Sequence, residues 1–173
     1  MSQVPSIVLK LSAQASLVHV AQAQYDQSVA EFKKIRPELS MPNELSSLRH
    51  QIDQQRTALS QAKETWEKLC EELLQAAGHH PQPIDTGNPH LNHMVKFAPT
   101  LLEAQRLCKE ASDEYLASRK LNHPDQDKLV ESRNKLDPAQ ALANSERQNW
   151  GKLCQELLQS MSATASVASS SSN

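Results

Sequence analysis

Residues 64–75 read Glu-Thr-Trp-Glu-Lys-Leu-Cys-Glu-Glu-Leu-Leu-Gln, and residues 148–159 read Gln-Asn-Trp-Gly-Lys-Leu-Cys-Gln-Glu-Leu-Leu-Gln. The chain has only two tryptophans and three cysteines, so a second copy of Trp-x-Lys-Leu-Cys-x-Glu-Leu-Leu-Gln exceeds what a shared helical composition produces. We interpret the two stretches as an internal repeat. The repeat predicts how the chain is built and leaves its activity open.

The correspondence between the two copies continues toward the N-terminus. The copies lie 84 residues apart, which is twelve heptads, and pairs at this spacing share their character: Leu45 and Leu129, Arg49 and Arg133, Ile52 and Leu136, and Asp53 and Asp137. Further upstream the spacing shortens by one residue and then pairs Leu11 with Met94, Val18 with Leu101, Ala21 with Ala104, and Phe32 with Tyr115. Each copy therefore spans two helices and the turn between them.

The composition predicts an all-α protein. Aromatic residues make up 3% of the 173 residues and there are only three glycines, whereas strands favour aromatic and β-branched side chains. The length suits one domain made of two similar halves. A formal net charge of −2 provides no overall attraction to nucleic acid or to an anionic membrane surface, so we expect neither as a partner.

The N-terminal segment leans apolar over residues 7–23, where Ala21-Gln22-Ala23 resembles a signal-peptidase site. Lys10 interrupts the apolar run, and no basic segment precedes it, so we do not expect a cleaved signal. No stretch has about 18 consecutive apolar residues, so we expect no membrane span. The three cysteines do not form close pairs, which favours a reducing compartment and a cytoplasmic location.

Prolines and glycines divide the chain into four expected helices. Proline has no amide donor and restricts the residue before it, so Pro37 and Pro42 mark a turn. The expected segments are helices over about 6–36 and 43–77, a turn over 122–125, and a last helix that ends at about Met161. The expected domain limits are a first α-hairpin repeat over 1–77, a His/Pro/Gly linker over 78–92, a second α-hairpin repeat over 93–161, and a disordered Ser/Ala-rich tail over 162–173.

Two helix boundaries stay open at the level of sequence. The third helix begins either at Pro89 behind an Asn88 cap or, if Pro99 restarts it, at Thr100. Asp137-Pro138 reads as an N-cap followed by a first-turn proline, so the last helix is either kinked there or made of two pieces.

Heptad patterns place the two tryptophans in equivalent positions. Trp66 and Trp150 both occupy the a position, as do Leu45, Ile52, Leu59 and Leu73 in the second helix. We interpret both tryptophans as core anchors; the alternative is an exposed aromatic anchor for a partner. The chain is therefore expected to form tandem duplicated antiparallel α-hairpins that assemble into an elongated four-helix bundle.

The seam of the fourth helix is poorer in large apolar residues than that of the second. Where the second helix offers mainly leucines, the middle of the fourth offers Ser132, Ala139, Ala143 and Glu146. A buried polar group costs free energy unless it is paired, so such positions either fix the register or lie at a seam that stays partly open. These four residues are our candidate contacts for a partner.

The sequence offers no catalytic constellation. We find no nucleophile paired with a base, no glycine-rich phosphate loop and no facing carboxylates, so we predict no catalytic residue, no cofactor and no enzyme activity. His79 and His80, with His90 and His93 further on, are the nearest approach to a metal site. Because flexible ligands must first be ordered, we expect no stoichiometric metal.

The favoured function is a non-catalytic protein–protein interaction or scaffolding module, which binds other proteins and includes self-association among its partners. One alternative is a metal-binding helical protein that uses the linker histidines, which elemental analysis of the purified protein would reveal. Another is a small secreted helical factor or secretion chaperone, which secretion assays without the first 20 residues would test. Helical bundles serve many roles, so the fold alone does not choose among these functions.

Overall fold

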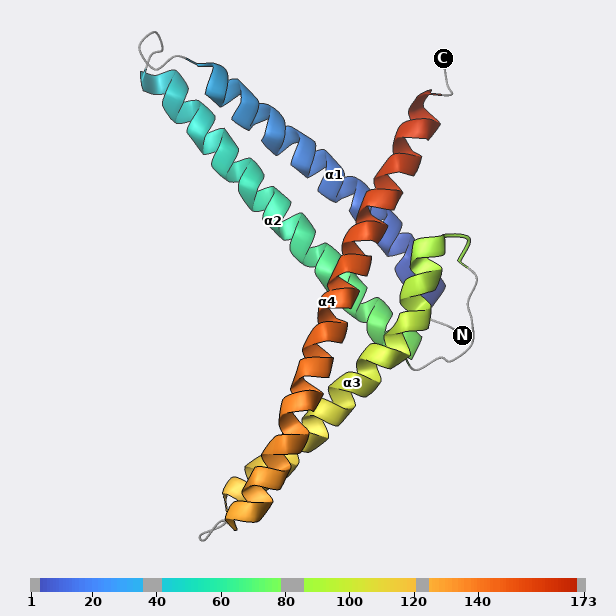
Figure 1. Cartoon of the computed structure of the whole chain (residues 1–173). Coiled ribbons are helices and arrows are strands. Elements are labelled where there is room, and N and C mark those ends of the chain that lie inside the picture. Colours follow the sequence, from blue (N-terminus) through green and yellow to red (C-terminus); the bar gives the residue numbers. More distant parts are fainter. Residues whose placement is uncertain (1–3, 36–41, 79–85, 121–124, 171–173) are drawn as a thin grey trace. The chain divides into compact units, whose positions relative to one another are not determined.

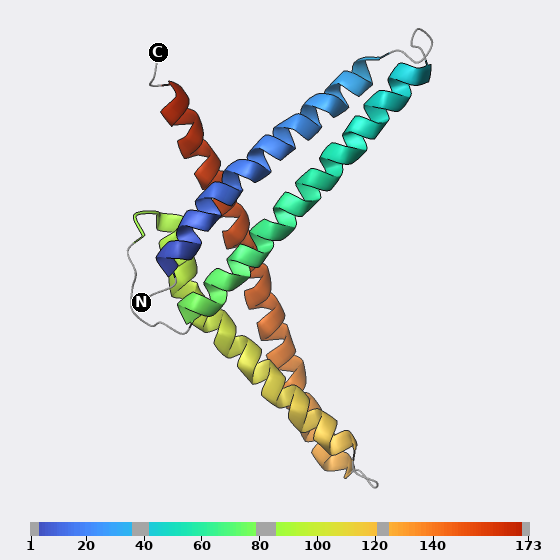
Figure 2. The ribbon, with the colours of Figure 1, turned by 180° about the vertical axis from the view of Figure 1, so that it is seen from behind.

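The computed structural model describes residues 4–35, 42–78, 86–120 and 125–170. These ranges contain four helices, α1 (Val4–Lys34), α2 (Pro42–Gly78), α3 (Pro89–Arg119) and α4 (Gln126–Ser170), and no strand. Helix α1 lies beside α2, and α3 lies beside α4, in both views of the ribbon (Figures 1 and 2). The prediction of an all-α protein built from two helical hairpins is confirmed.

Helix α3 begins at Pro89, as the earlier of the two expected starts. The side-chain oxygen of Asn88 accepts hydrogen bonds from the backbone amides of His90 (2.9 Å) and Leu91 (3.2 Å), and Pro89 takes the first helical turn, where no amide donor is needed. Gly87 precedes the cap with φ of 71°, a conformation that glycine adopts without strain. Pro99 lies inside the helix without ending it.

Helix α4 is continuous through Pro138, so the interpretation as two pieces is wrong. Proline removes one helical hydrogen bond, but Leu136 and Trp150 on either side are buried, and such packing outweighs a local preference to break. The helix also continues past Met161 to Ser170, where we expected a disordered tail. Alanine is a strong helix former, and extending an existing helix avoids the cost of nucleation.

Several predicted segments lie outside the described residues. They are the turn over 37–41, most of the linker with His79, His80 and Asp85, the turn residues 122–124, and the last three residues of the tail.

The chain divides into two compact units, each of which contains residues from both repeats. Of the described residues, one unit contains those within 4–72 together with 158–170, and the other contains those within 73–157. In the first, the imidazole Nε2 of His19 lies 3.0 Å from the backbone oxygen of Leu158. In the second, the side chain of Leu102 approaches Gly78 so closely that a Cβ there would lie 2.0 Å from its Cδ1. Residues 19 and 102 are equivalent in the two repeats, so the first helix of each repeat contacts the second helix of the other repeat.

Burial follows the heptads within each unit. Two large pairs of equivalent residues have matching exposure: Trp66 and Trp150 are 4% and 6% exposed, and Leu73 and Leu157 are both 0% exposed. Both tryptophans are thus buried.

In the first hairpin, two polar seam residues form hydrogen bonds between helices. The side-chain amide of Gln14 donates to the Ala62 carbonyl at 2.9 Å, and that of Gln51 donates to the Ser28 hydroxyl at 3.4 Å. Each bond joins α1 to α2, so these polar residues contribute to the pairing of the two helices.

Helix α1 carries apolar residues on its exposed face as well as in its contact with α2. An 18-residue window within it has a mean hydropathy of 1.3, and by length and composition alone this helix is able to cross a membrane. The core helix of a soluble protein and an N-terminal signal sequence pass the same test, so our expectation of no membrane span stays a prediction. Leu9, Leu17 and Val20 are 74%, 59% and 55% exposed along it.

Candidate functional site

The second hairpin contains a groove between α3 and α4, which we call the α3–α4 groove. It is an open hollow of about 430 Å³ and runs over Ala111 on α3 and Pro138 and Ala139 on α4. The two helices face each other through small side chains here. An alanine side chain is too short to fill the space between two helix backbones. The poor seam noted in the sequence therefore becomes a hollow on the surface.

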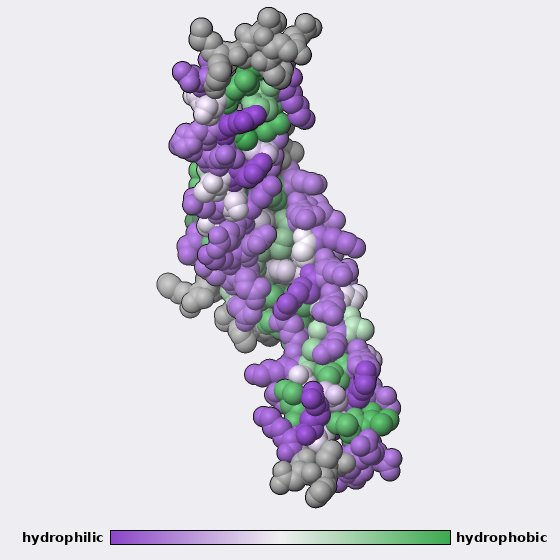
Figure 3. Space-filling view, turned by 90° about the vertical axis from the view of Figure 1, so that its left-hand side faces the viewer, coloured by the Kyte–Doolittle hydropathy of each residue, from purple (hydrophilic) through white to green (hydrophobic). Residues whose placement is uncertain are grey.

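Two exposed leucines stand in the α3–α4 groove. Leu107 of α3 is 40% exposed and Leu142 of α4 is 46% exposed, and both line the hollow above the alanines. Figure 3 shows apolar patches among hydrophilic side chains on this hairpin, in the lower part of the view. Apolar side chains gathered at a hollow, rather than scattered singly, are typical of binding surfaces.

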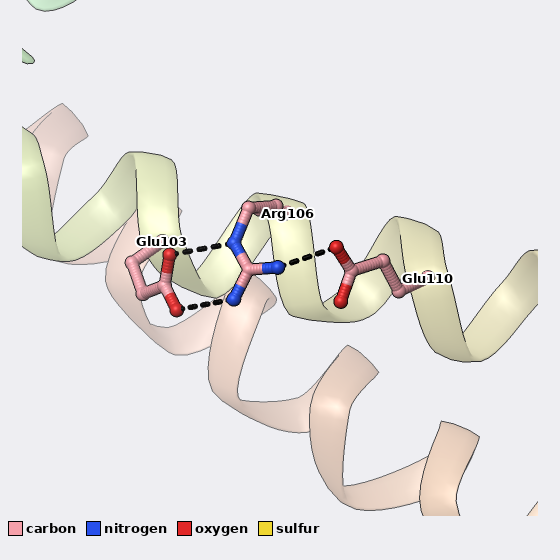
Figure 4. A network of polar contacts seen from close by, with 3 residues as sticks. All are labelled: Glu103, Arg106 and Glu110. Atoms are coloured by element: carbon pink, nitrogen blue, oxygen red, sulfur yellow. Dashed lines mark hydrogen bonds and ion pairs between the residues drawn. The ribbon is translucent and has the colours of Figure 1, made fainter. Parts of the chain in front are cut away.

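Two clusters of charged side chains adjoin the groove and form what we call its rim; of their members, Glu110, Glu114 and Lys135 line the groove itself. In the first, Arg106 binds Glu103 through two hydrogen bonds of 2.8 and 2.7 Å and also pairs with Glu110, which lines the groove (Figure 4). The hydrogen bond from Arg106 holds the pKa of Glu103 below its ordinary value, and the bonds to both carboxylates raise the pKa of Arg106. Glu103 and Arg106 are therefore both ionised at neutral pH.

The second cluster joins the two helices. The ammonium of Lys135 lies 2.9 Å from Glu114 on α3 and 3.3 Å from Glu131 on its own helix. Hydrogen bonds to these two carboxylates raise the pKa of Lys135, Glu114 contributing the larger effect. Both clusters are exposed, so they add little to the stability of the fold and mainly set the charge of this surface.

The first hairpin also has a hollow of about 400 Å³ along α2, but its lining is mostly polar, with His50 and Asp53 among the residues. Leu107 and Leu142 correspond to Gln24 and Ala58, while Glu110 and Lys135 correspond to Gln27 and Gln51. Ala139 corresponds to Gln55. The two repeats share their core but differ on this face, so the apolar, charge-rimmed groove is specific to the second hairpin.

A second hollow lies on another face of the same hairpin. It encloses about 400 Å³ and is lined by polar and charged residues, among them Lys109, Asp113 and Arg147, with Ala143 and Cys108 between them. It has no exposed leucine, so it offers less apolar area to a partner.

The four predicted contact residues do not share one surface. Ala139 lines the α3–α4 groove, and Ala143 lines the second hollow. Ser132 is buried, with 2% of its surface exposed, and its hydroxyl donates to the Leu129 carbonyl. Glu146 is half-buried and accepts a hydrogen bond from Asn149.

Sequence reasoning missed the two leucines of the groove. Leu107 and Leu142 both lie at g positions, outside the a/d pattern that we followed. Comparing the repeats position by position would have revealed them, because each replaces a residue that is polar or small in the first copy.

The described residues contain no group of three or more His, Cys, Asp or Glu side chains arranged to hold a metal. His90 and His93 lie in the first turns of α3, and the imidazole Nδ1 of His90 lies 4.0 Å from the carboxylate of Glu156. The cysteines Cys70, Cys108 and Cys154 form no disulfide; the first is buried and the others are half-buried.

Comparisons with protein-family models, with curated proteins and with solved structures found no match to this chain.

Proposed function

We propose that the protein is a non-catalytic helical module that binds other proteins, and that the α3–α4 groove is its contact surface. The observation that supports this most is the pair of exposed leucines, Leu107 and Leu142, standing in a hollow of about 430 Å³. Helix-in-groove contacts use the same physical elements, a hydrophobic hollow bounded by polar side chains.

The energetics favour a modest, adjustable contact. Each leucine is somewhat less than half exposed, so covering it stabilises a complex by about 1 kcal/mol from burial alone. Ala111 and Ala139 permit close approach of a partner backbone. Middle turns of α4 also carry few large buried side chains, and a segment of low local stability adjusts more readily to a partner.

The groove is tested by giving it the residues of the first repeat. Full-length protein with Leu107→Gln/Leu142→Ala is compared with wild type in affinity capture from cell extract with quantitative mass spectrometry. A matched control, Leu9→Gln/Leu17→Ala, makes the same two replacements at exposed leucines of α1.

We expect the capture to identify proteins that wild type and the α1 control both retain. The groove variant should retain at least about tenfold less of these proteins, a difference equivalent to 1.4 kcal/mol or more. Equal retention by all three proteins would place binding elsewhere. No protein retained above background by wild type would contradict the interaction module itself.

Scaffolding, self-association and a cytoplasmic location complete the proposal. The absence of a disulfide among the three cysteines suits a reducing compartment. Sedimentation equilibrium over a hundredfold range of concentration tests self-association, and a fluorescent fusion at either terminus tests the location.

A further inference from the structure

We propose that the partner in the α3–α4 groove is a helix of another protein that presents an apolar stripe flanked by Lys or Arg, rather than a second copy of this chain. The inference rests on the proposed function and deepens it. What carries it is the placement of the two charged clusters on the rim of an apolar hollow.

The rim is negatively charged in spite of its ion pairs. Each cluster has one cation between two carboxylates: Arg106 between Glu103 and Glu110, and Lys135 between Glu114 and Glu131. Each cluster therefore keeps one negative charge that its own cation does not neutralise. Such charges act over about 8 Å at physiological ionic strength, which includes any helix lying in the groove.

A basic partner satisfies both parts of this surface. Its apolar side chains cover Leu107 and Leu142, and its Lys or Arg residues bind the second carboxylate oxygens of Glu110 and Glu114, which line the groove and use Oε1 for their own cations. Complementary charge raises the rate of association and selects among partners more than it adds affinity.

A second copy of the chain fits this face poorly. A two-fold contact brings the same patch of each subunit together, so two negatively charged rims would face one another. The cations do not relieve this repulsion, because each is already bound by two carboxylates of its own subunit. Like charges across an interface suppress wrong pairings.

The walls of the groove favour a helix over an extended peptide. Addition of a strand needs an open sheet edge with free backbone donors and acceptors. Both walls are α-helices, whose backbone groups are bonded within the helix. Side chains alone remain for contact, and a helix presents them at the spacing of three and four residues that such walls accept.

Three synthetic peptides of about 20 residues, which span about 30 Å as helices, provide the test. One is an amphipathic helix with a leucine stripe flanked by lysines, the second replaces every lysine with glutamate, and the third contains the residues of the first in an order without a stripe. Binding to the full-length protein is measured by fluorescence anisotropy at low and at physiological salt.

Charge on the rim is altered without adding bulk. The variant Glu110→Gln/Glu114→Gln changes the net charge by two, and its matched control, Gln27→Lys/Glu31→Gln, makes an equal change at the equivalent positions of α1. A second rim variant, Glu103→Gln/Glu131→Gln, removes the other carboxylate of each cluster. Circular dichroism establishes that each protein is folded.

We expect the basic amphipathic peptide to bind at least about tenfold more tightly than either other peptide. Both rim variants should weaken it about tenfold at low salt and less at high salt, while the α1 control changes its affinity by less than about threefold. Equal binding of the acidic peptide, or equal effects of rim and control variants, would overturn the inference.

Failure of this inference is distinguishable from failure of the proposed function. Cellular partners lost by Leu107→Gln/Leu142→Ala but unaffected by both rim variants would contradict the charge selection and leave the groove as the contact surface. A dimer in sedimentation equilibrium that the leucine variant dissociates would instead identify the occupant as a second copy.

Discussion

Gln55 offers the sharpest test of how polar side chains in the seam affect stability. It occupies a d position of α2 and is half-buried, and its side-chain Oε1 is buried without a hydrogen-bond donor in the described part of the chain. An acceptor removed from water and left unpaired destabilises the folded state. We therefore expect Gln55→Met to increase the free energy of unfolding.

The magnitude follows from the oxygen that the substitution removes. An unsatisfied buried polar group costs about 1–3 kcal/mol, and methionine is close to glutamine in size and shape, so little repacking is needed. The position is only half-buried, which favours the lower part of that range, about 1–2 kcal/mol. In a protein of this length such a gain raises Tm by about 3–6 °C.

Gln14→Met is the matched control, since it makes the same chemical change in the facing helix. The amide of Gln14 has a partner, the Ala62 carbonyl at 2.9 Å, so the substitution removes a hydrogen bond instead of an orphaned oxygen. We expect a change between zero and a loss of about 1 kcal/mol. Urea unfolding followed by circular dichroism gives both values, and equal m-values would show that the same surface is exposed.

The sign of the change in unfolding free energy on Gln55→Met tests whether the oxygen is unpaired in solution. If Gln55→Met is neutral or destabilising while Gln14→Met behaves identically, the Oε1 of Gln55 is hydrated or paired in solution, and our account of the seam is wrong.

Three further predictions follow from the described packing. Trp66→Ala and Trp150→Ala should each lower the free energy of unfolding by about 3–5 kcal/mol, because both indoles are buried; losses under about 1 kcal/mol in urea unfolding would mean that they are exposed. Gly78→Ala should cost about 1–2 kcal/mol because its Cβ meets Leu102, whereas Gly151→Ala, which has nothing within 4 Å, should stabilise by up to about 1 kcal/mol; equal shifts in Tm would contradict this contrast. Hydrogen exchange should show less protection over residues 132–147 than over 59–74 in the free protein, and protection should rise over 132–147 in a complex; uniform protection in both states would remove the basis for a labile α4.

The repeat made much of the fold predictable. A match of Trp-x-Lys-Leu-Cys-x-Glu-Leu-Leu-Gln at a spacing of whole heptads specifies the same face of two helices, and the structure buries Trp66 and Trp150 almost equally. The N-cap at Asn88 was also predictable, because its side chain, the following proline and the apolar periodicity all indicate a helix start.

Continuity of α4 was not predictable from local rules. Asp137-Pro138 has the local form of a helix start, and only the burial of Leu136 and of the residues after it makes a continuous helix preferable. Local preference differs between the alternatives by a few kcal/mol at most, and tertiary packing is of the same size or larger. A single sequence does not show which contacts provide that packing.

The candidate site was half predictable, for a reason that lies in the repeat itself. Small residues in the seam of α4 directed attention to Ala139, which lines the hollow. The a/d pattern describes the residues that face the neighbouring helix and not those that face outward. The outward residues become recognisable only when equivalent positions of the two repeats are compared. The first copy has Gln24, Ala58 and Gln55 where the second has Leu107, Leu142 and Ala139. In the second copy the alanine and the two leucines line the same hollow, and this difference between copies with a shared core is the basis of the contact surface that we propose.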